Sequence, residues 1–346
     1  MNPEDELDHT LNIRPKGPYA ESWAWSAVET RPEPEIETST ELQPLPEEKP
    51  ETRVIAIVNQ KGGVGKSTTA VSLGAALAEL GYRILVVDLD PQGNASTGLG
   101  IRHNAREVTT YEVLLSEARI SDGIVPTELK GLEAVPSTID LAGAEIELVS
   151  QFSRETRLAR ALEPIRRDTY QFILMDCPPS LGLLTVNALT AADEVLVPIQ
   201  CEYYALEGLG QLLRNVRLIQ QNVNSNLRLT GIVLTMFDSR TKLSEQVVAE
   251  VRRYFGSRVY DTVIPRTVRL SEAPGYGMPI TAYDSDSKGA SSYRSLAQEL
   301  VQRPRDGEEV PDVRDLPEVI AARPPLTEDD DRPKRRLLKR KRRDEE

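Results

Sequence analysis

Val54-Ile-Ala-Ile-Val-Asn-Gln-Lys-Gly-Gly-Val-Gly-Lys-Ser-Thr68 joins a short apolar run to a glycine-rich turn. The run from Val54 to Asn59 is typical of a strand buried on both faces, and residues 70–80 have the apolar spacing of a helix that ends at Gly81. A strand, a glycine turn and a helix in this order are the setting of a phosphate-binding loop. Backbone N–H groups of such a turn, with the positive end of the helix, converge on anionic oxygens. The stretch therefore predicts a nucleotide site.

The turn departs from the common phosphate-loop pattern G-x-x-x-x-G-K-[ST], because Gln60 occupies the position of its first glycine. The end of the pattern, G-K-[ST], is present at Gly65-Lys66-Ser67. We therefore expect Lys66 to reach the β- and γ-phosphates and the Ser67 hydroxyl to bind magnesium. A second lysine, Lys61, lies at the tip of the turn, where it need not fold back onto its own nucleotide and could point into a neighbouring subunit. The alternative is a glycine turn with two solvated lysines.

Apolar strands alternate with helical segments along the rest of the chain. Strand-like runs lie at 83–90, 132–135, 170–176, 194–199, 229–235 and 260–264, and helical patterns at 110–116, 139–149, 155–164, 181–191, 205–221, 243–255 and 288–302. Ser180 is well placed to cap the helix at 181–191. This alternation predicts an α/β fold of the P-loop NTPase type, with a mostly parallel twisted sheet, helices on both faces and disordered flanking tails.

Charge and composition divide the 346 residues into three parts. Residues 1–52 are rich in Pro and Glu, with 4 basic and 13 acidic side chains, and are expected to be disordered. Residues 53–303 are expected to form the nucleotide-binding domain, and residues 304–346 a second disordered tail. Most of the net charge of −12 therefore belongs to the N-terminal extension and does not argue against nucleic-acid binding by the domain.

Both tails contain a feature that could bind a partner. Trp23 and Trp25 could anchor a further protein, although aromatic residues in such tails are often incidental. The segment 332–343 has nine basic residues, which could bind nucleic-acid phosphates or anionic lipid, or could simply be solvated. Because Leu337 and Leu338 are its only apolar residues, no stable membrane anchor is expected.

Cysteine usage and hydropathy point to a cytoplasmic chain. Cys177 and Cys201 form no C-x-x-C pair, so neither a disulfide framework nor a zinc site is expected. Cys177 follows an acidic strand end, but without a suitably spaced second cysteine it is better interpreted as a buried thiol than as an iron–sulfur ligand. No apolar run is long enough to span a membrane.

Acidic residues end two of the predicted strands. The carboxyl ends of parallel strands share one edge of a sheet, so Asp88, Asp90 and Asp176 are expected to lie beside the glycine turn and the loop after Thr235. Asp176 suits a magnesium site of few carboxylates and several waters, Asp88 could support that metal, and Asp90 could orient a water for γ-phosphate cleavage. Taken singly, an aspartate in such a position more often caps a turn or helix.

Five segments give a specific resemblance. Over about residues 52–303 the chain resembles the chromosomal ParA (Soj) branch of the ParA/MinD ATPases, whose first motif is the deviant Walker A box. The matching segments are Lys61-Gly-Gly-Val-Gly-Lys-Ser-Thr68, Asp88-Leu-Asp-Pro-Gln-Gly-Asn94, Asp176-Cys-Pro-Pro179, Thr235-Met-Phe-Asp-Ser-Arg-Thr241 and Val263-Ile-Pro-Arg-Thr-Val-Arg-Leu-Ser-Glu-Ala-Pro274.

The resemblance implies a magnesium-dependent ATPase cycle. ATP would close two subunits face to face, with Lys61 of each reaching the other's phosphates and Gly62 allowing the close approach. The homodimer would bind double-stranded DNA without sequence preference, and a ParB-type protein at centromere-like sites would stimulate hydrolysis. These properties predict a nucleoid-associated partitioning ATPase. The alternatives are a MinD-like membrane-cycling ATPase and an ATPase that positions polar or other cargo.

The same resemblance implies roles for particular residues. Nucleotide and metal contacts are expected from the box at Lys61, Gly62, Gly63, Val64, Gly65, Lys66, Ser67 and Thr68, with Lys61, Lys66 and Asp90 acting in catalysis and Ser67, Asp88 and Asp176 near the metal. Segments matching Met236, Pro265 and Arg266 would lie near the adenine. Arg240 and Arg269 would contact DNA. From the residues alone, these two are only arginines in polar loops.

Overall fold

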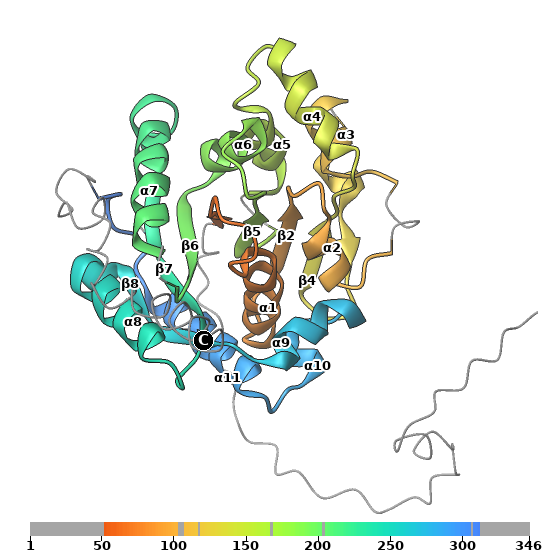
Figure 1. Ribbon diagram of the computed structural model, residues 1–346. Helices are drawn as coiled ribbons and strands as arrows, with labels where there is room; N and C mark the ends of the chain where they lie inside the picture. Colours follow the sequence, from red (N-terminus) through yellow and green to blue (C-terminus); the bar gives the residue numbers. More distant parts are fainter. Residues whose placement is uncertain are drawn as a thin grey trace, which may run out of the picture. The chain divides into compact units, whose positions relative to one another are not determined.

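The computed structural model describes residues 52–102, 107–116, 118–166, 169–202, 205–305 and 307–311. The predictions for the acidic extension, its two tryptophans and the basic cluster 332–343 lie outside these described residues. Within the described part, the predicted α/β alternation is confirmed (Figure 1).

The described strands form one eight-stranded sheet in the order β3-β4-β2-β5-β1-β6-β7-β8. The neighbouring pairs are parallel, except that β3 at the edge runs antiparallel to β4. The sheet is therefore mostly parallel, as predicted. The strands are β1 (Arg53–Ile57), β2 (Ile84–Asp88), β3 (Val125–Pro126), β4 (Leu132–Val135), β5 (Phe172–Asp176), β6 (Glu194–Gln200), β7 (Arg228–Phe237) and β8 (Val259–Pro265).

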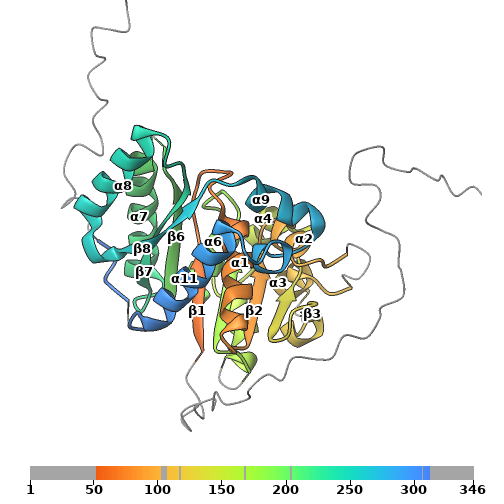
Figure 2. The same ribbon diagram turned by 90° about the horizontal axis from the view of Figure 1, so that it is seen from below.

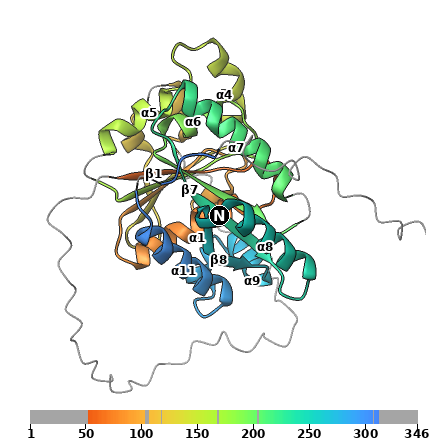
Figure 3. The ribbon, with the colours of Figure 1, turned by 90° about the vertical axis from the view of Figure 1, so that its left-hand side faces the viewer.

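Helices cover both faces of the sheet (Figures 2 and 3). Every residue of β1, β2 and β5 is buried, because apolar side chains on each face pack against a separate helical layer. One layer contains α3 (Thr110–Leu115), α4 (Leu141–Glu147), α5 (Arg157–Leu162), α6 (Leu183–Ala191) and α7 (Ala205–Asn222). The other contains α1 (Lys66–Glu79), α2 (Asn94–Gly98), α9 (Val268–Glu272), α10 (Ile280–Tyr283) and α11 (Lys288–Gln302). The helix α8 (Lys242–Phe255) lies near β8, and its buried apolar residues belong to the same core cluster as those of the first layer.

The start of α6 differs from the sequence prediction. The residue before this helix is Gly182, and the Ser180 side chain does not cap it. Instead, the carboxylate of Glu145 on α4 accepts hydrogen bonds from the N–H groups of Leu183, at 2.8 Å, and Leu184, at 3.3 Å. A negative charge at the N-terminus of a helix also interacts favourably with the helix dipole. The cap therefore comes from another helix.

The packed part of the chain continues beyond the predicted boundary at residue 303. Glu308 pairs with Leu229 through backbone hydrogen bonds of 2.9 and 3.0 Å, and its carboxylate contacts Arg258 at 3.1 Å. Val310 is 2% exposed and belongs to the apolar core. The boundary of the folded part therefore lies after, not at, residue 303.

Candidate active site

The phosphate-loop turn follows β1 and leads directly into α1. Gly63 and Gly65 have positive φ angles of 76° and 90°, a backbone conformation that residues other than glycine rarely adopt. The Asn59 carboxamide accepts the Lys61 N–H at 2.9 Å, and the Thr235 hydroxyl donates to the Val64 carbonyl at 2.8 Å. The turn is thus fixed at both ends, and the first residues of α1, Lys66 to Thr68, line a cleft.

Lys66 begins α1 and is 6% exposed. Burial lowers the pKa of its ammonium group, and the negative charges of Asp176 and Asp90 oppose that effect. A buried cation beside two carboxylates and a row of helix N–H groups is suited to bind phosphate oxygens. Lys66 therefore has the surroundings that its predicted phosphate contact requires.

Asp176 ends β5 and lies in register with Asp88 at the end of β2. Both carboxylate oxygens of Asp176 are buried, and neither has a hydrogen-bond partner in the structure. Burial, followed by the charge of Asp88, raises the pKa of Asp176 well above its usual value, whereas the nearby Ser67 hydroxyl and Lys66 lower it. An orphaned buried carboxylate costs free energy unless another group compensates it.

Asp88 differs from Asp176 because its oxygens are already occupied. Its Oδ2 accepts the Ser96 hydroxyl at 2.6 Å and the Ser96 N–H at 2.8 Å, and its Oδ1 accepts the Asp90 N–H at 3.1 Å. Burial raises the pKa of Asp88 to about 6, although these hydrogen bonds lower it. Asp88 thus holds α2 and the turn that contains Asp90 against the end of β2. These hydrogen bonds make it a positioning residue more than a direct metal ligand.

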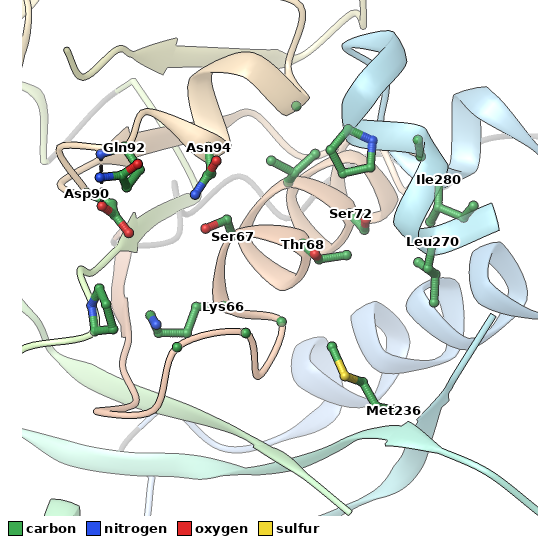
Figure 4. A pocket seen from close by; sticks show the side chains of 18 of the residues that line it. Lys66, Ser67, Thr68, Ser72, Asp90, Gln92, Asn94, Met236, Leu270 and Ile280 are labelled. Atoms are coloured by element: carbon green, nitrogen blue, oxygen red, sulfur yellow. Dashed lines mark hydrogen bonds between the residues drawn. The ribbon is translucent and has the colours of Figure 1, made fainter. Parts of the chain in front are cut away.

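Asp90 lies in the turn between β2 and α2 and faces the cleft (Figure 4). It is 6% exposed, and its Oδ1 accepts the Gln92 N–H at 3.0 Å. The Asp90 carboxylate is therefore held at the phosphate end of the cleft, where it could contact a water beside a bound triphosphate.

The cleft has a volume of about 370 Å³ and runs from the phosphate loop to an apolar end (Figure 4). Lys66, Ser67 and Asp90 lie at one end, and Met236 and Leu270 at the other. The apolar end suits a nucleobase. The remaining lining residues are Gly62, Gly63, Gly65, Thr68, Val71, Ser72, Gln92, Asn94, Gly98, Pro179, Ala273, Pro274, Met278 and Ile280.

Sequence reasoning identified only part of the apolar end. Met236 lines the cleft and has a positive φ of 52°, which is unusual for a side chain of this size. Pro265 and Arg266 are not among the lining residues. Leu270 and Met278, which sequence reasoning missed, come from α9 and from the turn after the short helix η6 (Ala273–Tyr276). The prolines and glycines of this segment concealed its helical turns.

Lys61 does not line the cleft of its own chain. Its Nζ contacts the Glu202 carboxylate at 2.7 Å, and both side chains are about half exposed, at 52% and 45%. Exposed ion pairs of this kind contribute about 0–1 kcal/mol, so little opposes a movement of Lys61 to another anion.

Arg240 and Arg269 are exposed, and each has acidic partners. Arg240 forms a two-pronged contact with Asp238, at 2.7 and 2.8 Å, which lowers the pKa of that aspartate. Arg269 contacts Glu272 at 3.1 Å and Asp284 at 3.2 Å. Both guanidinium groups thus remain accessible, but part of their charge is locally compensated.

The described side chains can be compared with the ligands that magnesium usually takes in proteins. No group of three or more His, Cys, Asp or Glu side chains in the described part is arranged to hold a metal ion. Magnesium does not need such a group, because it keeps several waters and takes one or two carboxylates together with phosphate oxygens. Asp176, whose carboxylate oxygens have no hydrogen-bond partner, and the Ser67 hydroxyl have the chemistry that such a site would need.

A family model described as an AAA domain matches residues 52–229. The Bacillus subtilis sporulation initiation inhibitor protein Soj is 57% identical over 248 residues, covering 72% of this chain and 98% of Soj. The Caulobacter vibrioides chromosome partitioning protein ParA is 54% identical over 255 residues, covering 73% and 96%.

Two solved structures share the fold. One was described as cobyrinic acid a,c-diamide synthase from Mycobacterium smegmatis with bound ADP and magnesium. It is 43% identical, has a TM-score of 0.64 and covers 72% of this chain and 94% of its own. The other, the cell division ATPase MinD from Pyrococcus furiosus, is 28% identical, with a TM-score of 0.61 and coverages of 72% and 98%.

Proposed function

The chain belongs to the ParA/Soj family of chromosome-partitioning ATPases, which use ATP and magnesium, and we propose that ATP drives it to form a DNA-binding homodimer. A ParB-type protein would stimulate hydrolysis and release the dimer from DNA. The observation that carries this proposal is the position of Lys61, which lies outside its own cleft beside Glu202. A phosphate-loop lysine in that position is free to serve a second subunit.

Within one subunit, the proposed roles follow from the surroundings of each residue. Lys66 and the N–H groups of the turn hold the β- and γ-phosphates, and Ser67 and Asp176 hold the metal. Magnesium, when bound, supplies charge neutralisation on the phosphate oxygens. Asp90 accepts a hydrogen bond from the attacking water, and Asp88 keeps the Asp90 turn in place through Ser96.

Between subunits, Gly62 supports the proposed close approach. A Cβ atom added at Gly62 would meet nothing within 4 Å, and its φ angle is not positive. The packing of a single chain therefore gives no reason for glycine at this position. A second subunit pressed against the turn would give that reason, since a side chain here would separate Lys61 from the partner's phosphates.

DNA binding is proposed for Arg240 and Arg269, which stay accessible beside their acidic partners. Phosphates would compete with Asp238, Glu272 and Asp284 for the two guanidinium groups. Such contacts read no base sequence, and they release counterions on binding. The proposal therefore includes association with bulk chromosome, and hence with the nucleoid, rather than with a particular site.

The proposed function is tested by DNA retention of the full chain with ATP, with ADP and without nucleotide, each at two salt concentrations. We expect retention only with ATP, weakening steeply with salt, with a slope of log K against log salt near −0.9 for each phosphate contact. Equal retention in all three nucleotide states would contradict an ATP-controlled DNA-binding dimer.

Reversing the charge of the two arginines should weaken DNA retention without affecting ATP-dependent dimers. In the variant Arg240→Glu with Arg269→Glu, each lost phosphate contact should lower the magnitude of the salt slope by about 0.9. Filter binding and sedimentation measure the two properties separately. A matched control is Arg119→Glu with Arg154→Glu, which changes two other arginines that also pair with nearby acids. Unchanged retention by the first variant would remove these arginines from the DNA surface.

Two other activities are less well supported. A MinD-like membrane cycle would need the segment 332–343 as its anchor, and Leu337 and Leu338 are the only apolar residues of that segment. No helix among the described residues is long and apolar enough to cross a membrane. The mycobacterial structure is described as a diamide synthase. A reaction with a cysteine nucleophile would require an accessible thiolate, whereas Cys177 and Cys201 are both buried, and burial raises the pKa of each thiol. A role in positioning other cargo would depend on the extension outside the described residues.

A further inference from the structure

Thr235 lies near the carboxyl end of β7, in register with Gln200 at the end of β6, and is 2% exposed. Its hydroxyl oxygen is 2.8 Å from the Val64 carbonyl of the phosphate loop and 3.0 Å from the Ile199 carbonyl of β6. A hydroxyl has one proton to donate, and the shorter contact is the one to Val64. A buried side chain of β7 therefore holds the phosphate loop beside the ends of two central strands.

The contact with Val64 fixes the direction of one peptide group in the turn. No cis peptide bond occurs among the described residues. In a planar trans peptide, the C=O of one residue and the N–H of the next point in opposite directions. With the Val64 carbonyl directed at Thr235, the Gly65 N–H points away from Thr235. Gly65 lines the nucleotide cleft, and no described residue accepts its N–H, which is thus left for a ligand.

Thr235 makes further contacts around the nucleotide cleft. A Cβ atom added at Gly65 would lie 4.0 Å from Cγ2 of Thr235, so the methyl group of Thr235 occupies the side of Gly65 where a side chain would be. The Thr235 carbonyl accepts the Cys201 N–H at 3.0 Å, and the next residue, Met236, lines the apolar end of the cleft. Thr235 therefore joins the phosphate end of the cleft to its apolar end.

We propose that Thr235 is a positioning residue of the ATPase reaction, whose hydroxyl orients the Val64–Gly65 peptide so that the Gly65 N–H donates to a phosphate oxygen. Backbone donors that are already in place stabilise developing charge without a reorganisation at the moment of reaction. Phosphoryl transfer depends mainly on such positioning and on charge stabilisation. This role does not depend on the proposed DNA-binding dimer.

ATP hydrolysis by the full chain tests the proposal with two variants that separate the hydroxyl of Thr235 from its methyl group. Thr235→Val keeps the shape of the side chain and removes the donor. We expect it to lower kcat by about 10- to 100-fold, because a misplacement of about 1 Å can cost about 100-fold in rate. Thr235→Ser keeps the hydroxyl and should keep kcat near that of the wild type. If Thr235→Val does not fold, Thr235→Cys, whose thiol is a weaker donor, should give an intermediate kcat.

Binding of inorganic tripolyphosphate with magnesium separates the two ends of the cleft, because this probe has no base. Thr235→Val should weaken the binding of tripolyphosphate and of ATP by similar factors, since both use the phosphate loop. Met236→Ala should raise the KM for ATP and leave the affinity for tripolyphosphate unchanged, because Met236 lies at the apolar end (Figure 4). If Thr235→Val weakened ATP alone, Thr235 would act through the apolar end, and the proposal would be overturned.

The matched control is Thr230→Val, which makes the same change on the same strand. Thr230 is 4% exposed, and its hydroxyl forms a hydrogen bond of 3.0 Å with the Tyr260 hydroxyl, but it does not line the nucleotide cleft. Thr230→Val and Thr235→Val should both lower the temperature of thermal unfolding, whereas only Thr235→Val should lower kcat. Three results would overturn the proposal: an unchanged kcat in Thr235→Val, an equal loss in Thr235→Ser, or an equal loss in Thr230→Val.

Discussion

Lys66→Ala is expected to lower the affinity for ATP by roughly 30- to 4,000-fold. Removing one partner of a buried, hydrogen-bonded charge pair costs about 2–5 kcal/mol, and every 1.4 kcal/mol is a factor of ten in affinity. Lys66 is 6% exposed and begins α1, so solvent cannot easily replace its ammonium group beside the phosphates. Isothermal titration with ATP and magnesium measures the change.

The matched control for this change is Lys288→Ala. Lys288 is also the first residue of a helix, α11, but it is exposed and does not line the nucleotide cleft. Thermal unfolding without nucleotide should reveal whether Lys66→Ala disturbs the fold, and Lys66→Met, which keeps the length of the side chain, provides a second variant. Unaltered ATP affinity in a folded Lys66→Ala protein would mean that the phosphates bind elsewhere.

Local sequence signals predicted the central part of the fold well. The apolar run before the glycine turn became β1, the strand predicted at 132–135 is β4, and the helix predicted at 288–302 is α11. The two strands were recognisable as short apolar runs, because a strand buried on both faces is apolar at nearly every position. In α11, the buried side chains recur with the period of a helix. The sequence also predicted that the phosphate loop, Asp88 and Asp176 lie at one edge of the sheet, because the carboxyl ends of parallel strands meet there.

The parts that were not predicted depend on contacts between distant residues or on helices too short to show a period. The cap of α6 comes from Glu145, which the local pattern around Ser180 could not indicate. The apolar end of the cleft comes from Leu270 and Met278, in a segment whose helices have five residues or fewer. The role of Asp88 depends on Ser96, which only the actual turn brings within 2.6 Å.

Asp90→Ala is expected to slow ATP hydrolysis by about 10²- to 10⁴-fold, the usual contribution of a positioned acid–base group. ATP binding should persist, because Lys66, Ser67 and the N–H groups of the turn remain in place. Phosphate release and nucleotide titration measure the two properties. Asp90→Asn is the matched control for turn structure, since its carboxamide oxygen can still accept the Gln92 N–H that Asp90 accepts at 3.0 Å. Equal turnover by wild type and Asp90→Ala would exclude Asp90 from the reaction.

The Asp90→Ala protein also isolates the role of Lys61, because a subunit that cannot hydrolyse ATP should accumulate as the ATP-bound dimer. Adding Lys61→Ala should return that protein to monomers while each cleft still binds ATP, since Lys61 contacts Glu202 and not its own cleft. Analytical ultracentrifugation with ATP and magnesium compares the single and double variants. Dimers that persist without Lys61 would show that the lysine does not join the subunits, whereas lost ATP binding would mean that it serves its own nucleotide.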